Sequence, residues 1–473
     1  MPKEYFNQQL LTYKRFDLLT ANDFAAYKPV MKKYVQLTVS MLLVGGLLGC
    51  APKSSDEYKA QATDPKYLHS AEEKLTEVIV HDIFSPPVAS RIYAYCNVAA
   101  YEALVNGYPK YQSLAGQLNK FEAPPKPEQG KEYCFELASL RAFMGVARTL
   151  TFSVQMYDEF EKGLYKSYEE MGMSSEVYER SMKYGEAVAA AVMAYAKKDN
   201  YPQTRGFRHT VTNAPGTWVP TPPAYMDAVE PLWTKIRPMT LDSSSQFKPA
   251  PPTKFSEAKG SAFYKDAMVV YETGVKLTEQ QKEIANFWDC NPFKMNVQGH
   301  AMFATKKISP GGHWMSIAGL VSRQSKADMM RTSQVYTLLS MTLFDAFISC
   351  WDEKYRSILV RPETYINNYI DDKWQPLLQT PPFPEYTSGH SVASNSSAVV
   401  LTSLFGDNFA YADSTEVRFG IPVRSYKSFK EAAAEASISR MYGGIHYMPA
   451  INEGATQGKR VGEWVLKKIK MEK

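Results

Sequence analysis

The sequence has few cysteines: five in 473 residues, with no Cys-x-x-Cys pair. It therefore lacks a dense disulfide framework. Setting Cys50 aside, the remaining four form an even set that permits two disulfides in an exported protein: Cys96, Cys134, Cys290 and Cys350. Because Cys96 and Cys350 lie among the apolar residues of helical patterns, we favour buried free thiols and expect the chemistry elsewhere.

The sequence also lacks a concentrated run of charge of one sign. The formal net charge is +5, and no cluster of Lys and Arg has the length expected of a nucleic-acid-binding arm. We therefore exclude nucleic acid as a partner. With 45% hydrophobic and 22% charged residues the composition is that of a globular protein, and the small positive charge is compatible with an anionic small-molecule substrate.

Long apolar runs are missing, apart from a short one near the N-terminus. Lys32 and Lys33 follow Met31, and an apolar run over 35–48 ends in the tetrapeptide LLGC, which closes on Cys50. This pattern predicts an export signal rather than a membrane span, and its ending resembles a bacterial lipobox, which implies lipidation of Cys50. The alternative is a short buried helix that ends in the cysteine.

We therefore predict an exported bacterial lipoprotein, periplasmic or anchored at the outer membrane or cell surface, that contacts the membrane through its lipid alone. Met31 is the expected start, which makes 1–30 an upstream extension. The signal peptide is expected over 31–50, and a tether over 51–69.

Strand-like alternation of useful length is absent as well, and so is any repeat of short period. Apolar residues recur at three- and four-residue intervals from about 70 to 198 and again after 278. Thr278-x-x-Gln281 and Ser428-x-x-Glu431 have the form of capping boxes. Helices are expected at about 325–355, from 387 to Gly406, up to Gly443, and near 452–470.

The pattern predicts an all-α fold of helical bundles in two halves. The N-terminal half covers 70–255 and ends in a proline-rich stretch from about 200, which we expect to be a long irregular connection packed by its Trp and Tyr residues. The C-terminal half covers 256–473 and carries the predicted site.

Basic residues gather near the ends of the predicted C-terminal helices. An oxyanion needs several converging donors, which Arg forks, a Lys point charge and a helix N-terminus supply. We predict that phosphate or vanadate is bound by Lys354, Arg361, Ser388, Gly389 and Arg440. His390 and His446 remain for the chemistry, one near each face of the anion.

Three segments carry these residues: KYRSILVRP, TSGH and SRMYGGIH. They resemble the signature K-x6-RP, PSGH and SR-x5-H of the superfamily of vanadium haloperoxidases and acid phosphatases, which includes the type 2 phosphatidic acid phosphatases. The resemblance covers about 340–450. Thr387 replaces the proline of the second motif, which loses a fixed φ and offers an N-cap hydroxyl.

Two aromatic residues favour the haloperoxidase branch. Trp351 and Phe383 stand where chloroperoxidase-like members hold a Trp and a Phe beside the vanadate, although both are equally plausible as core residues. His313, after a Gly-Gly turn, is a further candidate for the cleft.

The resemblance implies a role for each histidine. His446 is the vanadium ligand or, in a phosphatase, the nucleophile that forms a phosphohistidine. His390 is the acid–base residue that activates peroxide or protonates the leaving oxygen. The remaining residues hold the anion and stabilise the charge of a five-coordinate transition state.

We predict an enzyme that oxidises halide with peroxide, using vanadate as cofactor. The alternative is a phosphatase that needs no cofactor and hydrolyses a phosphate monoester through phosphohistidine. A third possibility is a non-catalytic surface lipoprotein that binds phosphate or polyphosphate. The sequence does not specify the halide or the phosphoester.

Overall fold

The N-terminal half of the structure is a set of packed helices. The computed structural model describes residues 55–298 and 300–473. The helices of this half are α2 (Ser55–Ala62), α3 (Lys66–His81), α4 (Pro86–Leu104), α5 (Phe135–Leu150), α6 (Asp158–Glu169), α7 (Ser175–Ala196) and the single turn α8 (Tyr201–Thr204). Every residue of α4 is buried, because α5 and α7 cover it within the half and the C-terminal helices cover its other side.

The C-terminal half is also helical, with two short antiparallel hairpins. Its helices are α9 (Ala262–Val275), α10 (Glu279–Phe287), α11 (Pro310–Gln324), α12 (Met329–Ser357), α13 (Pro362–Tyr369), α14 (Gly389–Phe405), α15 (Phe429–Tyr442) and α16 (Met448–Lys468). The hairpins pair β1 (Met295–Gln298) with β2 (Ala301–Ala304), and β3 (Tyr411–Asp413) with β4 (Arg424–Tyr426). The prediction of an all-α fold is confirmed.

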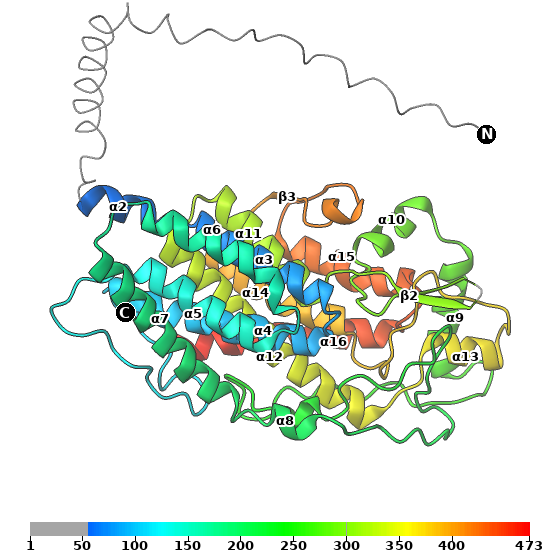
Figure 1. The fold of residues 1–473 in the computed structure, drawn as a ribbon. Coiled ribbons are helices and arrows are strands. Elements are labelled where there is room, and N and C mark those ends of the chain that lie inside the picture. Colours follow the sequence, from blue (N-terminus) through cyan, green and yellow to red (C-terminus); the bar gives the residue numbers. More distant parts are fainter. Residues whose placement is uncertain (1–54, 299) are drawn as a thin grey trace, which may run out of the picture. The chain divides into compact units, whose positions relative to one another are not determined.

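Helix α12 joins the two halves. It packs against both α4 and α14, and one continuous hydrophobic core includes residues of both halves (Figure 1). Helix α14 packs in turn against α15 and α16. The oxyanion motifs at the ends of α12, α14 and α15 are therefore set on helices that each pack against several others.

Local sequence signals fix several helix ends. Thr278 forms the predicted capping box with Gln281. Ser428 caps α15 by accepting from the Glu431 N–H, but the Glu431 carboxylate accepts from the N–H of Lys427 instead of that of Ser428. Helix α14 stops at Gly406, whose φ of +99° is favourable only for glycine.

The segment expected as a tether is helical from Ser55 onward. Tyr58 and Ala62, one turn apart on α2, are buried in the main core, and the Tyr58 hydroxyl donates to Glu132. The polar composition of this segment suggested a tether, but one apolar face is enough to dock it. The predictions for the upstream extension, the signal peptide and Cys50 lie outside the described residues.

The proline-rich connection is irregular, as expected, and it is anchored to α12. The buried Asp345 carboxylate accepts from the N–H groups of Met239, Thr240 and Leu241. Ten residues before Met239, the Val229 carbonyl accepts from Trp351 Nε1 (3.2 Å), and the Val229 N–H donates to the Pro382 carbonyl (2.9 Å). The connection therefore packs directly behind the residues expected at the site.

The described cysteines and helices settle two further points. Cys96, Cys134, Cys290 and Cys350 are buried free thiols, which confirms the prediction for Cys96 and Cys350. Among the described helices, none is apolar over a length that would cross a membrane.

Candidate active site

One cavity brings together residues from the second and third motif segments. It is lined by Pro86, Cys290, Asn291, Pro292, Phe293, Pro310, Phe347, Trp351, Pro381, Phe383, Gly389, His390, Arg440, Ile445 and His446. Lys354, Arg361 and Ser388 are fully buried behind this lining. The chain between the motifs therefore folds so that all of them lie in or directly behind one wall.

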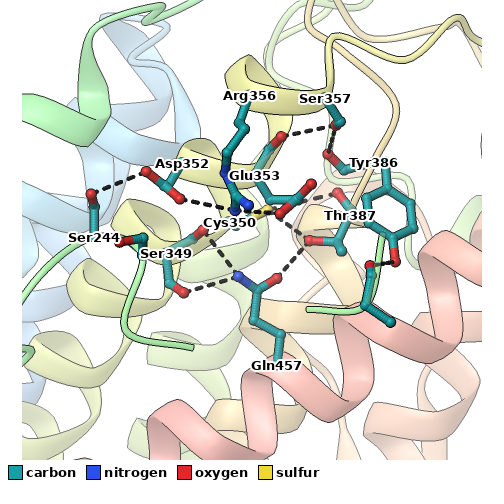
Figure 2. Close-up of polar contacts among 12 residues, drawn as sticks. Ser244, Ser349, Cys350, Asp352, Glu353, Arg356, Ser357, Tyr386, Thr387 and Gln457 are labelled. Carbon is teal, nitrogen blue, oxygen red and sulfur yellow. Dashed lines mark hydrogen bonds and ion pairs between the residues drawn. The ribbon is translucent and has the colours of Figure 1, made fainter. Parts of the chain in front are cut away.

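The helix start at the cavity is capped differently from the prediction. Ser388, not Thr387, is the N-cap of α14, and its hydroxyl accepts from the Ser391 N–H. The Thr387 hydroxyl instead donates to Gln457 Oε1 (2.7 Å), whose Nε2 donates to Ser349 (Figure 2). Thr387 therefore ties the motif loop to α16 and α12, and the proline of the family pattern is replaced by a polar anchor.

Close helix packing places this start. A Cβ on Gly458 of α16 would lie 2.3 Å from the Val392 carbonyl oxygen, and one on Gly454 would lie 3.0 Å from the Ser388 carbonyl oxygen. Both glycines are needed because α16 approaches the backbone of the first turn of α14 directly. The first turn of a helix carries unpaired N–H groups and a partial positive charge, so Gly389 and His390 stand at a seat that suits an anion.

Backbone carbonyls hold the three cationic side chains. Lys354 Nζ donates to the carbonyls of Pro384 (2.9 Å) and Glu385 (3.0 Å). Arg361 donates from Nε to Phe383 (3.0 Å) and from Nη1 to Ile445 (2.8 Å). Arg440 Nη1 donates to the Trp288 carbonyl (2.6 Å). Carbonyls fix the positions of these groups without neutralising their charge.

Glu385 orients His446. The Glu385 Oε1 atom lies 2.8 Å from His446 Nδ1 and also accepts from the Tyr447 N–H (3.0 Å). A carboxylate at this position keeps the proton on Nδ1 and leaves the lone pair of Nε2, which lies 3.1 Å from Arg361 Nη1. Sequence reasoning missed this role, although Glu385 stands three residues before Ser388 in the quoted motif loop.

Burial and mutual repulsion of the cationic side chains favour the binding of an anion. Burial, together with a neighbouring arginine in each case, lowers the pKa of Lys354 to about 7 and that of Arg361 to about 10. Burial also lowers the pKa values of both histidines well below their ordinary range, aided by Arg440 beside His390 and by Arg361 beside His446. A bound anion would relieve this crowding of buried positive charge.

The unpartnered polar atoms of the cluster fit an oxyanion. In the part of the chain that the structure describes, Arg361 Nη2, Arg440 Nε and His390 Nε2 are buried without a hydrogen-bond partner. Buried polar atoms are rarely left unpaired in a folded protein. Because these groups come from the three motif segments, a single tetrahedral anion such as vanadate would satisfy them together, its oxygens accepting from the two arginines and a hydroxyl on it donating to His390 Nε2.

The candidate cleft residues differ in position. Trp351 and Phe383 both line the cavity with ring centroids 5.0 Å apart, and the Arg361 guanidinium lies 5.2 Å from the Phe383 ring centroid. His313 was a candidate for the same cleft, but it is fully buried behind Cys290. A Gly-Gly turn before a helix does not reveal which layer the following side chain enters.

The comparisons with known proteins agree with this geometry. The family model for the second helical-bundle domain of vanadium chloroperoxidase matches residues 334–472. The crystal structure of a bacterial vanadium-dependent iodoperoxidase is 50% identical, with a TM-score of 0.82, covering 86% of this chain and 97% of that one. A comparison with curated proteins finds no match.

Two more distant structures share the fold. The holo form of a bacterial vanadium-dependent chloroperoxidase is 15% identical with a TM-score of 0.66, covering 86% of this chain and 97% of that one. The apo form of such a chloroperoxidase is 15% identical with a TM-score of 0.61, covering 81% of this chain and 95% of that one. Since half of the aligned residues match the iodoperoxidase over almost its whole length, this chain is an enzyme of the vanadium-dependent haloperoxidase family.

Proposed function

We propose that this protein oxidises iodide with hydrogen peroxide, consuming one proton and releasing hypoiodous acid and water. The observation that carries the proposal is the buried cluster of Lys354, Arg361 and Arg440, two of which have an N–H without a partner in the described chain. The 50% identity to a bacterial iodoperoxidase supports iodide as the halide.

Different residues of the site would bind the oxygens and the vanadium of vanadate. The oxygens would be bound by Lys354, Arg361, Arg440, the Ser388 hydroxyl and the N–H of Gly389 at the start of α14, and the vanadium by His446 through Nε2. Bound vanadate supplies a Lewis-acid centre that activates peroxide. Glu385 keeps the lone pair of His446 on the required nitrogen.

His390 is the proposed acid–base residue. Its lowered pKa keeps the imidazole neutral near pH 7, so that Nε2 can accept a proton from incoming peroxide and return it later in the cycle. This nitrogen is buried and has no hydrogen-bond partner among the described residues. The base is thus available to a substrate in the cavity.

The enclosed wall would exclude water from the reacting groups. Trp351, Phe383 and Phe347 contribute aromatic surface, and a large polarisable halide is compatible with such a surface. A drier cavity also strengthens each charge-assisted hydrogen bond to the anion.

The cradle would also accept phosphate, so hydrolysis of a phosphate monoester at His446 is the alternative reaction. The two are separated by one pair of assays on purified protein. Iodide oxidation should require both vanadate and peroxide, and inorganic phosphate should suppress it by competing for the cradle. Release of phosphate from an aryl phosphate without metal, combined with no iodide oxidation, would overturn the proposal.

A third outcome of these assays would indicate a protein that binds phosphate without catalysis. Phosphate binding without either reaction, in a folded protein, supports that assignment. His446→Ala is the matched variant, because it should abolish iodide oxidation while the fold, measured by circular dichroism, is retained.

We also propose that the chain is exported and held at the membrane by a lipid on Cys50. The short charged and apolar run over 31–50 supports this. Labelling with a radioactive fatty acid in cells should mark the wild-type protein but not Cys50→Ser, and equal labelling of both would contradict the proposal.

A further inference from the structure

A second group of chemically reactive side chains lies directly behind the cavity wall. Cys290 Sγ is 3.3 Å from His313 Nδ1, and Glu416 Oε1 is 3.4 Å from the same nitrogen. All three ligand-type atoms lie within 4.8 Å of one another. They come from the start of the loop after α10, from α11 and from the residue preceding the 3-10 turn Val417–Phe419.

Asp413 orients the histidine of this cluster. Its Oδ2 lies 2.9 Å from His313 Nε2, and its Oδ1 accepts from the N–H (3.0 Å) and hydroxyl (2.6 Å) of Thr415. Both carboxylate oxygens are therefore used, and His313 Nδ1 is directed at Cys290 and Glu416. A carboxylate behind a histidine is the usual outer support of a metal ligand.

Burial makes this arrangement costly without a further partner. The exposed fractions are 2% for Cys290, 0% for His313 and 4% for Glu416. Within residues 55–298 and 300–473, Glu416 Oε1 has no hydrogen-bond partner. A buried carboxylate oxygen without a donor is unfavourable, and a cation placed between the three atoms would satisfy it.

We propose that Cys290, His313 and Glu416 bind a divalent transition-metal ion of the zinc type. Sulfur, nitrogen and oxygen donors together suit zinc, whose bonds of about 2.0–2.3 Å place tetrahedral ligand atoms about 3.3–3.7 Å apart. The two measured separations from Nδ1, 3.3 and 3.4 Å, are in keeping with that spacing. On binding, the ion would replace the protons of the thiol and of Nδ1.

The metal cluster and the oxyanion cluster share one short segment. Trp288 gives its carbonyl to Arg440 and stacks its ring on His313, with centroids 4.6 Å apart. Cys290, two residues later, belongs to both the cavity lining and the metal cluster. An ion at Cys290 would therefore fix the backbone that positions one of the anion-binding arginines.

Metal analysis tests the proposal independently of any enzymatic reaction. The full chain is purified without chelator, and zinc is measured by plasma mass spectrometry; we expect about one ion per chain, falling below about a tenth in Cys290→Ser and Glu416→Gln. The matched control is Cys134→Ser, an equally buried thiol whose nearest polar partner is a carboxylate, Glu136, at 3.7 Å. It should keep its zinc.

A second readout covers variants that fold poorly. Cobalt added to the metal-free wild-type protein should give a near-ultraviolet thiolate-to-cobalt band, and added zinc should raise its Tm. Cys134→Ser should behave in the same way, and Glu416→Gln should show a weaker Tm increase. Absence of zinc in the purified wild-type protein, together with no cobalt band and no Tm response, would overturn the proposal.

Discussion

Arg91 in the N-terminal half and Arg361 in the C-terminal half are both buried, with exposed fractions of 4% and 0%. Arg91 Nε donates to the Asp199 carboxylate at 2.6 Å, and Nη2 donates to the Ala196 carbonyl. Arg361 donates to two carbonyls and contacts His446, and among the described residues its Nη2 has no partner. The nearby carboxylate of Glu385 is bonded to His446 instead.

The difference shows how one residue type serves two purposes. A buried guanidinium with its own carboxylate is neutralised inside the protein and contributes to the fold. A buried guanidinium held only by carbonyls keeps its charge for a ligand, and the fold bears the cost of that charge. The second half of the molecule therefore holds buried positive charge that an external anion can neutralise.

After the loss expected for His446→Ala, the largest expected effect is on catalysis, at His390. His390→Ala should lower kcat for iodide oxidation by about 10²–10⁴-fold, because the acid–base group is lost. His69 is the matched control: it is buried, burial lowers its pKa to about 3, and its Nδ1 is paired with the Tyr336 hydroxyl. Replacing His69 should change stability but leave kcat within a few-fold. Equal loss of kcat in both variants would contradict the assignment.

The next effect concerns stability, at Arg91. Arg91→Ala leaves the buried Asp199 carboxylate unpaired and should lower the free energy of unfolding by about 3–5 kcal/mol. Urea denaturation measures this. The folded fraction of Arg91→Ala should keep the wild-type kcat. If this variant is as stable as the wild type, Arg91 does not have the structural role assigned to it.

Arg361→Gln should lower activity without lowering stability, the reverse of what is expected for Arg91→Ala. Iodide oxidation should fall by about 10²–10³-fold, as expected when one charge-stabilising donor is removed. In the absence of vanadate and phosphate, the Tm should be unchanged or higher, since a buried charge without a carboxylate partner has been removed. The Tm increase that orthovanadate gives to the wild-type protein should be strongly reduced. A large loss of anion-free stability would show that Arg361 is structural.

The last expected effect is a pH dependence of stability, set by Lys354. Burial lowers its pKa in the folded protein from about 10.5 to about 7, so between these values the unfolded chain binds more protons than the folded one. The anion-free protein should therefore gain stability from this group as pH rises from 7 to 10.5. Lys354→Met should lack this gain, and saturating vanadate should flatten it in the wild type. Parallel stability curves for wild type and variant would contradict the prediction.

Much of this was predictable because the signals are local. Helical periodicity gave the all-α fold, and Thr278 and Gly406 set helix ends through their own backbone and side-chain chemistry. Lys354, Arg361 and Arg440 stand near the ends of predicted helices. This position, together with the two histidines, was enough to indicate an oxyanion site from the sequence alone.

The rest depends on contacts between distant segments. Glu385 gains its role only when its loop meets His446, 61 residues away. Thr387 looked like an N-cap until α16 brought Gln457 to its hydroxyl. His313 and Cys290 form a cluster with Glu416, 103 and 126 residues beyond them by sequence number, so no local pattern indicates it.

The attachment of Val229 to Trp351 has a consequence for how this enzyme diversifies. Tyr355 Oη donates to the same Val229 carbonyl at 2.6 Å, so two side chains of one helix face depend on a single peptide group of a segment without regular structure. An insertion or deletion upstream of that peptide would tilt the indole facing the cavity and leave every signature residue in place. The length of the loop before Val229 therefore bears on the position of a cavity aromatic residue that lies outside the signature.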